Sequence, residues 1–199
     1  SSKVLKVESA SESWTYDGKA HTKYEYTVTY GDDETYTVTI AEGETTGTVA
    51  LSTGDTVTIT PAATATITHV AETTVNNAFT WTVANEGYYT KGEDEVGTLS
   101  VTAATLTIKT ESANKEYDGE ALTAGGSISG FVNGETATFT VTGTITNVGE
   151  VPNSYTLVFD QTAVESDYTL SESIGTLKIT TSSKVLKVES ASESWTYDG

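Results

Sequence analysis

The chain has 199 residues, no cysteine and a formal net charge of −18, and all ten of its basic residues are lysine. A strongly acidic surface without arginine argues against nucleic-acid binding and repels anionic membranes, so we expect neither a nucleic-acid partner nor direct membrane contact. The lack of cysteine excludes disulfides and thiol chemistry, and no apolar run approaches the length of a membrane span.

Apolar residues alternate with threonine through much of the chain, which predicts strands with one buried face. The first clear pair is a hairpin at about residues 24–40, in which two alternating runs flank a Gly-Asp-Asp-Glu turn. No long segment shows a helical period, so we predict an all-β fold. Further alternating runs lie at residues 57–59, 79–83, 137–141, 155–157 and 177–179.

Residues 182–199 repeat residues 1–18 without a single change, at an offset of 181 residues. Identity over this length indicates a tandem array, so we expect the chain to be a piece of a longer repeat protein. Residues 183–199 would supply only the first strand of a further module. Because such a stub cannot bury a core, we expect it to be ordered only where it docks on the preceding module or on a neighbouring chain.

A second, diverged repeat lies inside the 181-residue unit. The Tyr-Asp-Gly triplet at residues 16–18 recurs at 117–119, and residues 97–102 match 175–180. We predict two small Ig-like β-sandwich modules in tandem, end to end, plus the first strand of a third. The predicted ranges are 1–103 for the module with the inserted hairpin, which the second module lacks, 104–182 for the shorter module and 183–199 for the stub. Matched positions include Gly54 and Gly134, Asp55 and Glu135, His21 and Leu122, and His69 and Asn147.

The two Tyr-Asp-Gly triplets have the composition of fixed turns. An aspartate can accept the backbone N–H two residues on, and glycine permits a positive φ. We expect each tyrosine ring to pack at a sandwich corner with its hydroxyl bonded to the backbone, and we expect Asn133-Gly134 to form another turn. We therefore assign a structural role, and no ligand contact, to Tyr16, Asp17, Gly18, Tyr117, Asp118 and Gly119.

Candidate catalytic and metal-binding residues are few. The only histidines, His21 and His69, both lie in the first module, and we interpret both as structural substitutions. The sequence has no nucleophile motif, phosphate loop or paired metal-ligand pattern. The acidic runs at 32–34 and 93–95 lack the alternating ligand spacing of a calcium loop. We predict no catalytic residue, no metal and no cofactor.

Two further expectations concern cross-links and linkers. Lys6 and Lys109 alternate out of phase with their apolar neighbours, so both should face solvent and form no isopeptide bond. The connections at residues 102–104 and 181–183 are short and contain neither glycine nor proline, which restricts hinge motion between modules.

A family resemblance is carried by the segments 115–123, 130–136, 146–149, 167–169 and 175–177. These segments cover nearly all of the second module, and they resemble the YDG/MBG-type tandem repeat domains of bacterial, often Gram-positive, cell-surface adhesins. The first module departs from the pattern by its insertion and by His69, where the family has asparagine. The resemblance implies an extracellular tandem module without known catalysis, on a bacterial cell surface and anchored to the cell wall through regions outside this sequence.

These features lead us to expect a structural stalk repeat that projects a distal binding head and contacts neighbouring repeats of the same chain. Two alternatives stay open. One is a module that binds host glycan or mucin through aromatic rings, although alternation would bury Tyr24, Tyr26, Tyr30 and Trp81. The other is a self-assembling surface fibre, in which the stub donates a strand to an open sheet edge.

Overall fold

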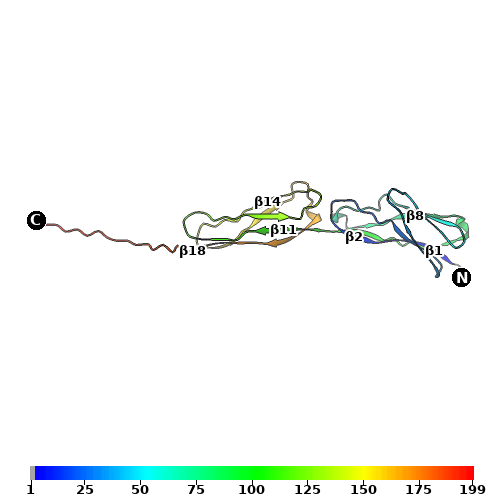
Figure 1. Ribbon diagram of the computed structural model, residues 1–199, viewed down its shortest axis with the longest axis horizontal. Coiled ribbons are helices and arrows are strands. Elements are labelled where there is room, and N and C mark those ends of the chain that lie inside the picture. Colours follow the sequence, from blue (N-terminus) through cyan, green and yellow to red (C-terminus); the bar gives the residue numbers. More distant parts are fainter. Residues whose placement is uncertain (1–2) are drawn as a thin grey trace. The chain divides into compact units, whose positions relative to one another are not determined.

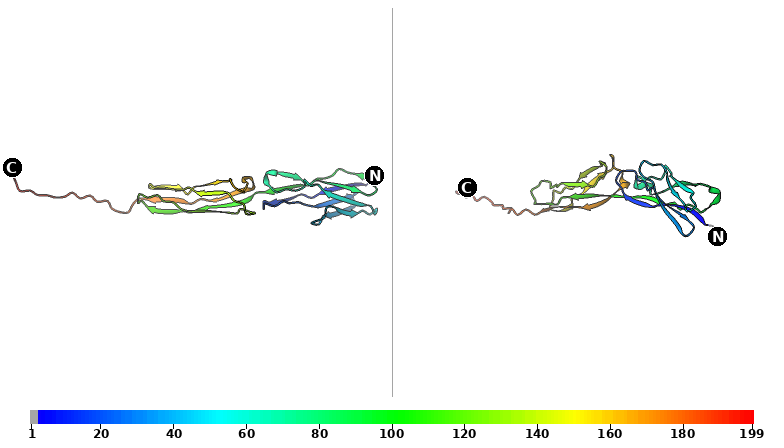
Figure 2. Two further views of the ribbon diagram at one scale, coloured as in Figure 1. Left: turned by 90° about the horizontal axis from the view of Figure 1, so that it is seen from above. Right: turned by 45° about the vertical axis from the view of Figure 1, so that its right-hand side comes forward.

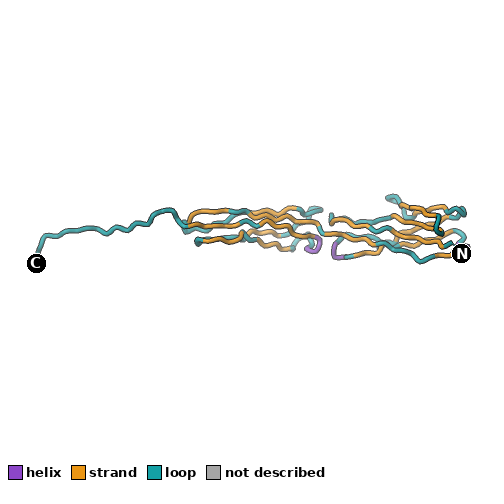
Figure 3. The backbone as a smooth tube through the Cα atoms, turned by 90° about the horizontal axis from the view of Figure 1, so that it is seen from below, coloured by secondary structure: helices purple, strands orange, loops and turns teal. Residues whose placement is uncertain are grey.

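A computed structural model describes residues 3–199 and confirms the predicted all-β fold (Figure 3). Helical structure in this range is limited to three single turns of 3₁₀ helix, and no helix is long and apolar enough to cross a membrane. Contacts between residues divide the chain into two compact units. The first unit comprises residues up to 107 together with 129–138 and 159–171, and the second comprises 108–128, 139–158 and 172–199. The module boundary near residue 103 stays a prediction.

The core of the first unit lies between two sheets (Figure 1). In one sheet, β1 lies between β3, to which it is antiparallel, and β9, to which it is parallel. In the other sheet, β6 lies antiparallel between β5 and β8. The strands of these sheets are β1 (Val4–Ser9), β3 (Glu25–Tyr30), β4 (Glu34–Thr39), β9 (Thr90–Lys91), β5 (Gly47–Ala50), β6 (Thr56–Pro61) and β8 (Phe79–Val83).

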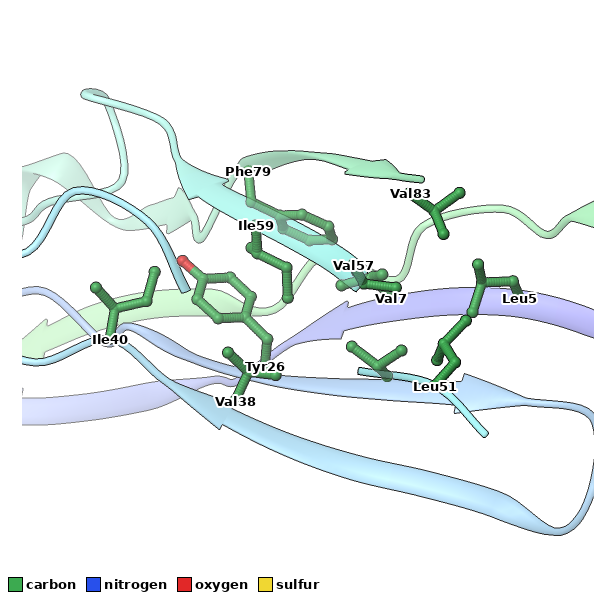
Figure 4. Close-up of a cluster of buried hydrophobic side chains, with 11 residues drawn as sticks. Leu5, Val7, Tyr26, Val38, Ile40, Leu51, Val57, Ile59, Phe79 and Val83 are labelled. Carbon is green, nitrogen blue, oxygen red and sulfur yellow. The ribbon is translucent and has the colours of Figure 1, made fainter. Parts of the chain in front are cut away.

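The core of this unit collects the alternate apolar residues of both sheets, as the period of two requires. Figure 4 shows Tyr26, from β3, directed towards Ile59 and Phe79 of the opposite sheet. The rings of Tyr26 and Phe79 meet edge to face with centroids 5.4 Å apart. The buried members are Leu5, Val7, Tyr26, Val28, Val38, Ile40, Leu51, Val57, Ile59, Phe79 and Val83.

The predicted hairpin at about residues 24–40 is present, because β3 and β4 pair antiparallel from Glu25↔Thr39 to Tyr30↔Glu34. The prediction that the second module lacks this element is wrong for its first strand. Strand β13 (Gly126–Ser129) lies beside β11 (Ala104–Thr110), as β3 lies beside β1. The additional strands of the first module are therefore β4 and β5, which extend the two sheets.

A third sheet of the first unit joins its first and last sequence segments. Strand β2 (Glu12–Thr15) pairs parallel with β10 (Thr98–Thr102), and β10 pairs antiparallel with β7 (Thr74–Asn76). Two 3₁₀ turns, η1 (Val70–Glu72) and η2 (Glu86–Tyr88), lie in the connections.

The later strands repeat this scheme. Strand β12 (Ala113–Glu116) pairs parallel with β18 (Thr176–Thr180), and β18 pairs antiparallel with β15 (Gly149–Pro152). The register Ala113↔Leu177 matches Glu12↔Leu99, so the structure reproduces the inner sequence alignment. The remaining elements are β14 (Thr138–Val141), β16 (Tyr155–Val158), β17 (Tyr168–Ser173) and η3 (Glu165–Asp167), with β17 beside β11 and β14 beside β16.

Residues 182–199 form no strand, although their sequence is that of β1 and β2. Figures 1 and 2 draw this segment as a trace without arrows. Its apolar side chains are exposed, and Leu186 retains 91% of its accessible surface whereas the matching Leu5 retains none. The difference follows from pairing, because β1 is held by β3 and β9 and the repeated segment has no such neighbours in the described chain.

Candidate functional site

Both Tyr-Asp-Gly triplets form the predicted turns. The Asp17 carboxylate accepts the N–H of Lys19 at 2.9 Å, and Asp118 accepts the N–H of Glu120 at 3.0 Å. The backbone bond from Lys19 lowers the pKa of Asp17, while for Asp118 the Lys115 ammonium makes the larger contribution to a lowered pKa. The glycines that follow, at positions 18 and 119, have φ of 77° and 85°, in the left-handed region that favours glycine.

The predicted bond from the Tyr16 hydroxyl to the backbone is wrong. The Tyr16 ring is buried, and its hydroxyl donates to the Glu135 carboxylate at 2.6 Å. These two residues are 119 positions apart in the sequence, and both belong to the first compact unit. Within residues 3–199 the matching hydroxyl of Tyr117 makes no such bond, and 46% of the Tyr117 residue surface is exposed.

Glu135 is the centre of a tyrosine–acid cluster, by which we mean Tyr16, His69, Glu135, Asp167 and Tyr168. The hydroxyl of Tyr168 donates to the second oxygen of Glu135 at 2.8 Å, and the rings of Tyr16 and Tyr168 meet edge to face at 5.6 Å. Burial raises the pKa of Tyr168 to about 12, and burial followed by the bond to Glu135 raises the pKa of Tyr16 further. Burial, with a smaller contribution from the Glu135 carboxylate, therefore disfavours ionisation of both phenols.

The second half of the cluster is a histidine–aspartate pair. Asp167 is fully buried; its Oδ2 lies 2.7 Å from His69 Nδ1, and its Oδ1 accepts the N–H of Val70 at 2.9 Å. The His69 ring stacks on Tyr16 at 5.7 Å. Glu72 accepts the N–H groups of Thr68 and His69, and these backbone bonds lower its pKa. A buried acid with two partners fixes the His69 ring and the start of η1 relative to η3.

His21 also has local partners. Its Nε2 lies 2.8 Å from Asp17 Oδ1, and its ring stacks on Trp14 at a centroid distance of 4.8 Å. His21 forms an isolated antiparallel β-bridge with Ile67, and Leu122 forms one with Ile145. The aligned positions His21 and Leu122 are therefore equivalent in the structure.

Sequence reasoning missed a pair of buried asparagines. The Asn77 amide donates to the carbonyls of Ala10 and Lys23, each at 2.8 Å. The matching Asn153 donates to the carbonyl of Glu111 at 2.9 Å. Both asparagines are fully buried. The signal was present in the sequence, because in each module the asparagine begins the pattern Asn-small-aromatic-Thr at the same place before a strand.

Asp55 and Tyr89 form a second tyrosine–acid pair, which reproduces the Glu135–Tyr168 part of the cluster. The Tyr89 hydroxyl donates to Asp55 at 2.6 Å, as Tyr168 does to Glu135. Each tyrosine directly follows a 3₁₀ turn, η2 or η3, and each acid follows a glycine with positive φ. Asp55 also accepts from the Asn85 side chain at 2.7 Å. The Asp55–Tyr89 pair and the Glu135–Tyr168 pair are thus the same structural feature.

The aromatic rings considered for glycan binding mostly pack on the core. Tyr26 is buried, and Tyr24, Tyr30 and Trp81 are partly buried against the core cluster. The Lys91 ammonium lies over the Trp81 ring at 4.4 Å, and the Trp81 indole N–H donates to Asp94 at 2.7 Å. These contacts leave little free ring face in this region.

The lysines considered for cross-links face solvent as predicted, with 40% of the Lys6 side chain and 59% of the Lys109 side chain exposed. Lys6 donates to Glu95 at 2.9 Å. Within residues 3–199, no group of three or more His, Asp or Glu side chains is arranged to hold a metal ion.

Comparison with known proteins gives no relative at the level of sequence or structure. No family model matches the chain, no curated protein matches it, and no solved structure matches it. The turns, the asparagine pair and the tyrosine–acid cluster are therefore known from their own geometry alone.

Proposed function

We propose that this chain is a structural stalk repeat of a bacterial cell-surface adhesin, and that it projects a distal binding head away from the cell. The proposal is carried by the unchanged repeat of residues 1–18 at 182–199. A sequence that restarts after 181 residues builds an array whose length is set by copy number.

The repeated bonding scheme supports this proposal. In each module the first sequence segment is fixed to the last one through side chains, because Gly97 N–H donates to Ser9 Oγ and Gly175 N–H donates to Thr110 Oγ1. Buried polar groups with fixed partners favour a single rigid arrangement. A chain without cysteine must obtain its rigidity from such contacts and from its apolar cores.

Strand direction also suits a load-bearing element. Because β2 and β10 are parallel neighbours, tension applied to the two ends of the chain pulls them in opposite directions along their length. The same holds for β12 and β18. Their hydrogen bonds are then loaded together in shear, whereas a peeling geometry would break them one at a time.

The high negative charge supports an exposed location. Like charge keeps neighbouring copies soluble in a crowded surface layer and disfavours their collapse on one another.

Small-angle scattering on chains of one, two and three copies tests the proposal, where a copy means residues 1–181. We expect the maximum dimension to increase by a constant increment with each copy. A particle whose dimension grows like that of a freely jointed or compact chain would contradict a stalk.

Force spectroscopy tests the mechanical part. Pulling through the two chain ends should require more force than pulling through attachments at Lys19 and Ala103, which follow the same ends of β2 and β10. Equal forces in the two geometries would remove the mechanical argument.

The glycan-binding alternative has one observation in its favour. Tyr88 is 85% exposed at the tip of η2 and could stack on a sugar face. A glycan array on the full chain and on Tyr88→Ala tests this alternative, which predicts binding that the variant loses.

A further inference from the structure

We propose that the Tyr117 turn of one copy of this chain binds the Asp55–Tyr89 pair of a second copy. This inference rests on the proposed function and deepens it, because it names the contact that would hold successive copies in a fixed orientation. The first compact unit already contains a contact of the same kind.

The established contact is that of Tyr16 with the Glu135–Tyr168 pair. The Tyr16 hydroxyl donates to Glu135 at 2.6 Å and its ring packs on Tyr168. The adjacent Gly18 lies so close to Asn133 that a Cβ on the glycine would be 2.6 Å from the Asn133 Cβ. A Tyr-Asp-Gly turn is therefore shaped to receive a tyrosine–acid pair.

Tyr117 presents the same donor. It follows β12 as Tyr16 follows β2, and its N–H donates to the carbonyl of Thr180 at 2.8 Å as that of Tyr16 donates to Thr102 at 2.7 Å. The two backbone turns also match in their Asp-to-N–H bond and in the positive φ of their glycine.

The acceptor side of the contact, a tyrosine–acid pair, is also present in the first module. Asp55 and Tyr89 are bonded to each other as Glu135 and Tyr168 are. The Asp55 carboxylate accepts from two side chains, Asn85 and Tyr89, and the Tyr89 hydroxyl in turn contacts the Thr53 hydroxyl at 2.5 Å.

The two Tyr-Asp-Gly turns differ in whether a partner covers them. Tyr16 is 3% exposed and has its partner, whereas Tyr117 is 46% exposed. Apart from its two chain neighbours, no described residue comes within 4 Å of a Cβ placed on Gly119, in contrast to Gly18. The exposed Tyr117 and the open surface at Gly119 are therefore what we expect of a Tyr-Asp-Gly turn whose tyrosine–acid partner is not bound.

Two further positions change together in a way that fits a second contact. The buried Asp167 of the cluster is matched by Tyr88, which is 85% exposed, and its partner His69 is matched by the exposed Asn147. A buried acid beside histidine is thus replaced by an exposed tyrosine and an asparagine, which offer apolar area and a neutral hydrogen-bonding group. The second contact is expected to lack the charged pair.

The partner is a second copy of this chain because the sequence itself restarts after Thr181. Asp55 and Tyr89 of that copy would be covalently tethered to the end of the module that carries Tyr117. The tether matters, because two chains with a net charge of −18 repel each other in free solution. Linkage raises the effective concentration of the partner, often to the millimolar range.

The test uses a two-copy chain, residues 1–181 followed by residues 1–199. The chain has no native cysteine, so Ser173→Cys in the first copy and Thr37→Cys in the second accept spin labels at two unique exposed sites. Pulsed electron-spin measurements then give the distribution of distances between the two copies. We expect one narrow distribution.

The decisive variants are Tyr117→Ala in the first copy and Asp55→Ala in the second, each of which should broaden the distribution severalfold. The matched controls are the same substitutions in the other copy, where no second copy faces the changed residue; these should leave the width unchanged. A narrow distribution that neither decisive variant broadens would overturn the inference.

Failure of this inference and failure of the proposed function are distinguishable. A constant scattering increment per copy together with insensitivity to Tyr117→Ala rejects the contact and keeps the stalk. A chain that collapses or flexes freely in scattering rejects the stalk, whatever the variants do.

Discussion

Residues 1–18 and residues 182–199 have one sequence and two structures. In the first position Leu5 and Val7 are fully buried in β1, between β3 and β9. In the second position Leu186 and Val188 are 91% and 93% exposed, and the segment forms no strand. Local propensity is the same in both places, so it cannot be what orders the strand.

The comparison shows that tertiary partners decide the state of this segment. β-propensity measures how well a residue fits a pleated, half-buried surface rather than an intrinsic backbone preference. In the first unit the surface is supplied by β3, β9 and β10, and the buried Asn77 fixes the carbonyl of Ala10 at the end of β1.

Deleting one or the other segment is expected to have the largest effect. Removal of residues 1–18 takes away β1 and β2 and should prevent the first unit from folding, because β1 separates β3 from β9. Removal of residues 182–199 should leave the melting temperature unchanged. Circular dichroism with thermal unfolding measures both, and a large loss of stability on the second deletion would show that the segment has a docking partner.

Single leucine truncations sharpen the comparison. Leu5→Ala should lower the free energy of unfolding by about 2–5 kcal/mol, because the side chain is fully buried. Leu186→Ala, in the same sequence context, should change it by less than about 0.5 kcal/mol. Urea unfolding of both variants measures the difference, and equal effects would contradict the structural assignment.

Asn77→Ala tests the polar contact that closes the end of β1. The substitution removes the side-chain donor to the half-buried carbonyls of Ala10 and Lys23. We expect a loss of about 2–3 kcal/mol, since each unsatisfied buried group costs about 1–3 kcal/mol. Asn76→Ala is the control, because Asn76 is exposed on β7. A similar loss in the control would assign the effect to the strand rather than to the amide.

Tyr16→Phe removes only the hydroxyl that donates to Glu135. We expect the free energy of unfolding to fall by about 1.5 kcal/mol, the lower range for a hydrogen bond to a charged group. Tyr197→Phe makes the same change in the repeated sequence, where the tyrosine is 94% exposed, and should have no measurable effect. Identical unfolding curves for both variants would reject the hydroxyl–carboxylate bond.

The smallest expected effect on stability comes from ionisation of the buried phenols. It is absent at neutral pH and grows as the pH rises above about 10. The pKa values of Tyr26 and Tyr168 are each raised to about 12 in the folded chain, first of all by burial. The folded state therefore holds more protons than the unfolded state between about pH 10 and pH 12. The contribution of these two phenols to stability should be constant below pH 10 and should fall through this window, as followed by tyrosine absorbance and circular dichroism together. Constant stability up to pH 12 would contradict the burial of these hydroxyls.

Local features of the fold could be predicted from the sequence. The alternation of apolar residues with threonine located β3 and β4, and the Tyr-Asp-Gly triplets located both turns, because these signals depend on neighbours within a few positions. The repeat alignment also identified equivalent positions such as His21 and Leu122.

Long-range partners could not be predicted in the same way. Nothing near Tyr16 indicates that its hydroxyl reaches Glu135, 119 residues away, or that Asp167 is buried against His69. These contacts depend on how separate strands are brought together, and one sequence without an alignment carries no record of that. The expected backbone partner for Tyr16 was wrong for this reason.

Amide hydrogen exchange on residues 182–199 tests the central claim most directly, namely that this segment is ordered by the remainder of a copy. It would be measured in the 199-residue chain and in a chain extended to a complete second copy. We predict free exchange in the first chain, and in the second chain protection equal to that of residues 4–15. Protection already present in the 199-residue chain, or none in the extended one, would contradict the account.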